Sequence, residues 1–216
     1  MIYLVLVFLA LASAAQAGPW PRPPGEQFLS FSVETPIAEN AVSQSFVSAF
    51  YERGLRHDWT IGIDAGADAL GYEKSFVFLR RPVWSGARSK LAFEIGLGRQ
   101  TTKTGTGSAL RPALTWGRSL EAFDRSGWMQ LDASIAHLPT LQSSVLKMET
   151  TVGLTISTKV TAMLQATVEA EKTGQAVAKV TPSVAYKIHD NLHVLGGAIF
   201  SDDTRAKLKF GVWTKF

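Results

Sequence analysis

Most of the chain alternates between apolar side chains and polar or small ones, with a period of two. Between residues 91 and 98, Leu91, Phe93, Ile95 and Leu97 are separated by Ala, Glu and Gly. In an extended strand these two sets point to opposite faces of the sheet. The same alternation recurs in residues 59–66, 129–136, 145–156, 160–169 and 205–216. Helical periodicity is nowhere sustained, so the pattern predicts an all-β protein.

About twelve such segments lie between turn signals, and bacterial single-chain barrels have an even number of strands. The connections contain Pro, Gly, Asn or Asp, as tight turns require. The expected strands cover residues 26–35, 42–53, 57–67, 72–82, 88–99, 107–119, 127–137, 143–157, 160–171, 176–188, 191–201 and 204–216.

Three features favour a membrane barrel over a soluble β-sandwich. Several expected strands reach about ten residues, the length that a tilted strand needs to cross a bilayer. Charged residues stand in the middle of strands, which suits a wet or ion-paired lumen. Aromatic residues fall near strand ends, as interfacial girdles require. The expected girdle residues are Trp59, Tyr72, Trp84, Trp116, Trp128, Tyr186 and Trp213. We therefore predict a closed antiparallel transmembrane β-barrel of about twelve strands with short loops.

The first residues form a separate unit. Residues 2–12 are an almost unbroken apolar run, and small residues at Ala15 and Ala17 suit cleavage before Gly18. The run is too short to span a bilayer, and no Lys or Arg precedes it. A cleaved signal peptide over residues 1–17 is the prediction, with a buried N-terminal helix as the alternative.

Residues 18–25 are rich in proline and form a stiff, extended lead into the first strand on the periplasmic side. The sequence leaves open whether this lead enters the lumen. Residues 26–216 then form the barrel. With both chain ends in the periplasm, the outward-facing connections are short, which disfavours an adhesin or a protease.

The carboxyl end carries a motif. Residues 207–216 alternate and end on Phe216, with apolar Leu208, Phe210 and Val212 before it. This resembles the C-terminal assembly signal of bacterial outer-membrane β-barrels, with Phe210, Val212 and Phe216 as its residues. The resemblance implies a Gram-negative host, insertion by the outer-membrane assembly machinery, and contact with outer-membrane lipid.

Composition narrows the chemistry. The chain has 46% apolar and 19% charged residues, too apolar for disorder, and no cysteine. A disulfide scaffold, a thiolate nucleophile, a Cys-ligated metal and a Cys-anchored lipoprotein are thereby excluded. The net charge of +4 is scattered without a basic block, so no nucleic-acid partner is expected.

Charged side chains on the inferred lumen face supply the candidate functional residues. Two interpretations stay open: an internal salt-bridge network that fills a rigid barrel, or a solvated passage that attracts polar or anionic solutes. In size and strand count the chain is similar to small monomeric outer-membrane channels, including the acidic-oligosaccharide porins, and this resemblance implies a passage. The lumen candidates are Lys74, Arg80, Arg111, Lys147 and Lys179, with Glu94 and Glu149 as counter-charges.

An outer-membrane lipid hydrolase is a third alternative, and it depends on the four histidines. His193 is the only candidate, with Ser183 and Ser201 conceivable on neighbouring strands. No G-x-S-x-G motif, metal-ligand spacing or phosphate loop occurs, so we expect no enzyme and no cofactor.

Overall fold

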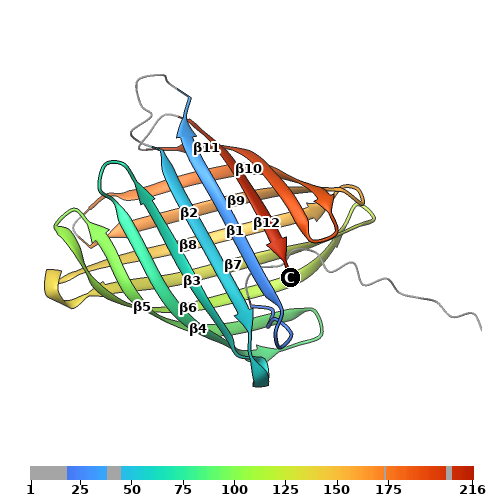
Figure 1. Ribbon diagram of the computed structural model, residues 1–216, viewed down its shortest axis with the longest axis horizontal. Coiled ribbons are helices and arrows are strands. Elements are labelled where there is room, and N and C mark those ends of the chain that lie inside the picture. Colours follow the sequence, from blue (N-terminus) through green and yellow to red (C-terminus); the bar gives the residue numbers. More distant parts are fainter. Residues whose placement is uncertain (1–18, 38–44, 173, 203–205) are drawn as a thin grey trace, which may run out of the picture.

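The computed structural model describes residues 19–37, 45–172, 174–202 and 206–216, and these form a closed barrel of twelve antiparallel strands (Figure 1). Two short 3₁₀ turns, Arg56–Asp58 and Pro139–Leu141, lie between strands. In the described part of the chain, no helix has the length and apolar content needed to cross a membrane. The strands are β1 (Gln27–Pro36), β2 (Phe46–Gly54), β3 (Thr60–Asp68), β4 (Glu73–Ser85), β5 (Ser89–Thr102), β6 (Gly105–Ala122), β7 (Arg125–Leu138), β8 (Ser143–Thr155), β9 (Val160–Glu171), β10 (Ala176–His189), β11 (Leu192–Ser201) and β12 (Lys207–Lys215).

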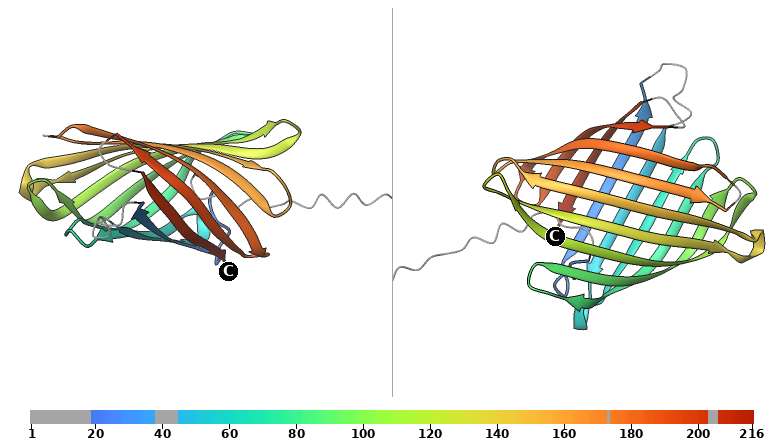
Figure 2. Two further views of the ribbon diagram at one scale, coloured as in Figure 1. Left: turned by 90° about the horizontal axis from the view of Figure 1, so that it is seen from above. Right: turned by 180° about the vertical axis from the view of Figure 1, so that it is seen from behind.

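Every strand pairs with its neighbours in the sequence, and β1 pairs with β12 to close the ring (Figure 2). At the closure Gln27 N–H donates to the Phe216 carbonyl at 2.7 Å, and Phe216 N–H donates back at 3.1 Å. We call this end of the barrel, where β1 begins and β12 ends, the terminal mouth, and the opposite end the far mouth. The prediction of a closed twelve-stranded antiparallel barrel is confirmed.

The two faces of the wall differ in polarity. Large apolar side chains project outward from the strands, among them Leu97, which is 65% exposed, Val77 and Phe210. Inward-facing Phe76 and Phe78 are buried. An apolar outer band around a largely polar interior is the reverse of a soluble protein and is typical of a barrel surrounded by lipid.

The interior contains two apolar clusters, one near each mouth. Towards the far mouth Phe76 packs with Ala109, Ala136, Leu138 and Val145. Towards the terminal mouth the buried residues Trp128, Met163, Ala185 and Leu195 form the second cluster, with Trp20 and Trp213 packed against them. We call this second group the tryptophan cluster.

Strand ends differ from the sequence-based bounds. β6 is longer at both ends than expected, and β4 continues beyond Pro82 to Ser85 with a register shift between Pro82 and Trp84. Proline is tolerated there because the β3–β4 pairing ends at Thr60 and Arg80, so no ladder bond to β3 needs the missing N–H. Parts of the expected strands at 42–53 and 204–216 lie outside the described residues.

The aromatic-girdle prediction is wrong for three residues. Trp128 is only 4% exposed and Trp213 packs on the tryptophan cluster, so both face the lumen. Tyr72 lines a pocket at the far mouth. Trp128 shares the strand phase of the polar Gln130, and the alternation within β7 therefore places it inside. The outer surface keeps Trp59, Trp84 and Tyr186 as exposed aromatics.

Candidate functional site: the barrel lumen

A continuous chain of ion pairs covers the lumen wall between β2 and β6. At its centre Arg80, only 8% exposed, contacts Glu52 at 2.5 Å and Glu94 at 2.7 Å. From Glu94 the chain continues through Arg111, at 3.2 Å, to Asp64, at 2.6 Å from Arg111. We call this chain the ion-pair ladder, with members Lys74, Asp64, Arg111, Glu94, Arg80, Glu52, Arg22 and Glu26 in order of contact.

Aromatic rings support the arginines of the ladder. The guanidinium carbon of Arg111 lies 4.2 Å from the centroid of the Phe76 ring, and that of Arg80 lies 5.0 Å from Phe78. Arg22 lies 4.5 Å above Phe28. Each cation is therefore held by carboxylates and by the negative face of a ring. Opposite charges alternate along the ladder, so this wall presents little net charge to the lumen.

The wall formed by β7, β8 and β9 is more acidic. Lys147 contacts Glu149 at 2.7 Å, and Gln165 donates to the other carboxylate oxygen of Glu149 at 2.6 Å. Asp132 lies directly opposite Glu149 in the β7–β8 register and accepts a hydrogen bond from Gln130 at 2.5 Å. Two carboxylates thus lie side by side on this wall, and Lys147 pairs with Glu149.

The structure brings most of the predicted lumen residues into contact with one another. The paired residues are Lys74, Arg80, Glu94 and Arg111 in the ion-pair ladder, and Lys147 and Glu149 on the acidic wall. Lys179 lies apart from them, exposed on β10, between Thr167 of β9 and Ser201 of β11 in the register. Its role in selecting solutes stays a prediction, as do the roles of the other six.

Residues 19–26, which we call the N-terminal segment, lie in the terminal mouth. Trp20 packs against the tryptophan cluster, and Pro19 is fully buried. A Cβ atom at Gly117 on β6 would come within 2.4 Å of the Trp20 ring and 2.6 Å of Pro19. Only glycine leaves room for this contact, which presses the segment against the wall across the lumen from its own strand.

The later residues of the N-terminal segment, from Arg22 onward, are hydrogen-bonded to β2. Arg22 donates to Glu52 at 2.7 Å, and Gly25 N–H donates to the Gly54 carbonyl at 2.9 Å. A Cβ atom at Gly54 would lie 2.1 Å from the Pro23 carbonyl oxygen, so this position also requires glycine. The sequence left the position of the lead-in open, and the structure places its described residues within the mouth.

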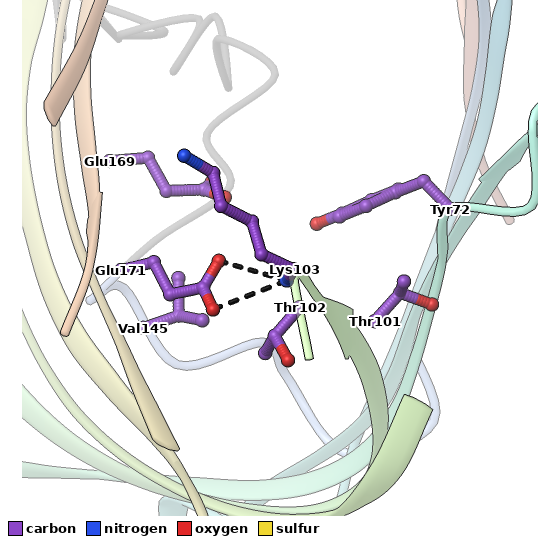
Figure 3. A pocket seen from close by; sticks show the side chains of 7 residues that line it. All are labelled: Tyr72, Thr101, Thr102, Lys103, Val145, Glu169 and Glu171. Carbon is purple, nitrogen blue, oxygen red and sulfur yellow. Dashed lines mark hydrogen bonds between the residues drawn. The ribbon is translucent and has the colours of Figure 1, made fainter. Parts of the chain in front are cut away.

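A pocket of about 260 Å³ opens at the far mouth (Figure 3). The β5–β6 turn reaches across to β9, where Lys103 N–H donates to both carboxylate oxygens of Glu171 at 3.1 and 3.2 Å. Tyr72, from the β3–β4 connection, faces the same space. Burial raises the pKa of the Tyr72 hydroxyl above its usual range, and the nearby Glu169 carboxylate adds to the effect.

Sequence analysis missed four residues of this interior: Trp20, Arg22, Glu52 and Trp128. The alternation identifies Trp128, as described above. The inward orientation of Glu52 could not be predicted, because Phe46 and Phe50 also point inward on β2. Both faces of that strand therefore carry apolar residues. Trp20 and Arg22 precede the first strand, where no periodicity applies.

The hydrolase candidate is not assembled. Register pairs His193 with Lys187 and Ser183 with Gly197, which separates the two side chains by four residues along the sheet. His137 Nδ1 does lie 3.1 Å from Ser144 Oγ on the outer surface. In a catalytic triad the nucleophilic hydroxyl bonds to Nε2 of the histidine, and Nδ1 bonds to the orienting acid. The Ser144 hydroxyl lies at Nδ1, so this pair does not have the arrangement of a triad. Within the described ranges, no group of three His, Cys, Asp or Glu residues could hold a metal ion.

A closed twelve-stranded barrel with an apolar outside and a charged interior is the architecture of small outer-membrane porins. The chain matches the NanC porin with a TM-score of 0.59 and 9% identity, covering 88% of this chain and 98% of that one. It matches the KdgM porin with a TM-score of 0.61 and 9% identity, covering 88% and 99%. The match to a structure of KdgM in complex with disordered oligogalacturonate has a TM-score of 0.62 and 8% identity, and it covers 88% of this chain and 99% of that one. At these identities the likeness shows a shared fold.

No protein-family model matches the sequence, and no curated protein sequence is similar to it.

Proposed function

We propose that the protein is an outer-membrane channel for small polar solutes, anionic ones included. The observation that carries this proposal is a polar, charged lumen enclosed by a barrel whose outer surface is apolar. The porin fold of NanC and KdgM supports it, and one KdgM structure contains an acidic sugar.

The lumen charges would select solutes by electrostatics. The cations of the ion-pair ladder are engaged by carboxylates, so they hold the wall rigid more than they attract anions. Lys179 is exposed and lies in the inward phase of β10, with Thr181 and Ala185. It is therefore the cation of the predicted set best placed to meet an anionic solute.

The orientation and location belong to the same proposal. Export through residues 1–17 would deliver the chain to the outer membrane, where the terminal mouth faces the periplasm. The far mouth then faces outward, and the β5–β6 turn, bonded to Glu171 of β9, covers part of that entrance.

A second candidate function is a structural barrel with a filled, non-conducting lumen. The ion-pair ladder and the N-terminal segment favour it, because both occupy interior space that a wide pore would leave to water.

Conductance of the refolded protein in a planar lipid bilayer separates the two candidates. Discrete single-channel steps, absent from protein-free detergent controls, are expected of a channel. Lys179→Gln should shift the reversal potential in a salt gradient towards cation preference, because it removes one positive charge from the lumen. Silence from a correctly folded barrel would favour the structural candidate instead.

A further inference from the structure

We propose that the N-terminal segment, residues 19–26, is a plug that occludes the terminal mouth and limits access to the lumen. Its effect on solute passage rests on the proposed channel function. The occlusion itself does not, because it is a statement about which lumen surfaces water can reach.

The segment crosses the whole width of the barrel. It joins β1 at Gln27, while Trp20 lies against Gly117 on β6 and packs on the tryptophan cluster, to which β7 contributes Trp128. In a closed ring of twelve strands, β7 is the strand opposite β1. The segment turns at residues 23–26, where Glu26 N–H donates to the Pro23 carbonyl at 3.0 Å, and its first residues then reach from β2 to β6. A simple lead into the first strand would need no contact with the far wall.

An apolar anchor holds the distal end of the segment. Trp20 joins a cluster contributed by β7, β9, β10 and β11, through Trp128, Met163, Ala185 and Leu195. Burying Pro19 and much of the Trp20 ring removes a large apolar surface from water, which stabilises the docked position. The ring also fills the space that glycine leaves at position 117.

A polar anchor holds the middle of the segment. Arg22 is 4% exposed, donates to Glu52 and Glu26, and stacks on Phe28. Because Glu52 also binds Arg80, the segment continues the ion-pair ladder of the wall. Withdrawal of Arg22 would leave Glu52 with only one of its two cations, so undocking is costly.

The test compares the full mature chain with a variant that starts at Glu26. The two are measured in parallel by bilayer conductance and by thiol labelling of Gln130→Cys, introduced into each. Gln130 faces Gly117 in the β6–β7 register, beneath the segment. The natural chain has no cysteine, so this thiol is unique. A small water-soluble methanethiosulfonate reagent is the probe.

A second variant, Trp20→Ala with Arg22→Ala, removes both anchors without shortening the chain and covers the case in which the truncated chain fails to fold. Trp84→Ala with Arg88→Ala is the matched control, since it removes an exposed tryptophan and an exposed arginine at the same end of the barrel.

We expect labelling of Gln130→Cys to become on the order of tenfold faster in both anchor-free variants and to stay unchanged in the control. Unit conductance should rise about twofold or more in the same two variants. Faster labelling with no conductance in any variant would support the plug and refute the channel. Equal labelling in the full chain and both variants would overturn the plug, whether or not the barrel conducts.

Discussion

Single charged residues inside this barrel are stabilised by contacts that strand periodicity does not reveal. Arg80 binds carboxylates from β2 and β5 and stacks on Phe78, so one guanidinium joins three strands. Burying such a group is unfavourable unless all of its partners are present. The sequence placed Arg80 and Glu94 on the lumen side, but which carboxylate meets which cation depends on register.

Removing Arg80 should therefore be strongly destabilising. Arg80→Ala leaves Glu52 with Arg22 and Glu94 with Arg111, each short of one cation, and should lower the free energy of unfolding by about 3–5 kcal/mol. Urea unfolding of the protein in lipid vesicles measures this. Arg99→Ala, an exposed arginine on β5, is the control and should change stability little. Equal stability of the two variants would contradict the importance of the ladder.

The difference in polarity between the two faces of a strand determines which face points outward. β5 presents Phe93, Ile95 and Leu97 outward, with the buried Ala92 and Glu94 inward. Burial of one face against lipid and of the other against the lumen fixes the register, since a slip of one residue would exchange the faces. Strands such as β2 and β4, which carry phenylalanine on the inward face, are set by pairing with their neighbours instead.

A charge on the outer face should cost most at mid-strand. Ile95→Arg, near the middle of β5, should reduce the folding free energy by about 2–4 kcal/mol, whereas Ser89→Arg, in the same phase at the start of the strand, should cost about 0–1 kcal/mol. Unfolding titrations in phospholipid vesicles compare them. Similar losses at both positions would show that β5 does not face lipid as the apolar band implies.

The last strand allows assembly to be separated from stability. Phe216 bonds to Gln27 through its backbone, which Phe216→Ala retains, while Phe210, Val212 and Phe216 present exposed side chains outward. We expect Phe216→Ala to reduce the amount of protein assembled in the outer membranes of cells by up to about tenfold. The purified variant should refold normally in detergent. Assembled amounts are measured by membrane fractionation and immunoblotting. A variant that assembles fully in cells would refute the assembly role.

At the scale of the whole molecule, closure places the start of β1 and the end of β12 at one mouth, and the N-terminal segment folds into that mouth. The interior becomes partly filled by the protein itself. The barrel, its strand number and its short connections were predictable from periodicity and turn residues. The plug was not, because its contacts join residues that are between about thirty and a hundred positions apart in the sequence.

Export should leave a defined N-terminus. We expect the protein purified from outer membranes of a Gram-negative host to begin at Gly18, because small residues at Ala15 and Ala17 suit signal peptidase. Intact-mass spectrometry of the membrane fraction checks this. A replacement of Ala17 by a bulky residue should leave the precursor uncleaved, and a natural chain that still carries residues 1–17 would overturn the prediction.

The sequence by itself determined the class of fold and the face on which most charges lie, because side-chain direction in a strand follows directly from position. Tertiary structure alone decided which charges pair, that Tyr72 faces a pocket at the far mouth, and that Trp20 and Arg22 lie within the lumen. The reason is physical: alternation is a local property, whereas contacts across a closed barrel depend on register, curvature and the close approach that Gly54 and Gly117 permit.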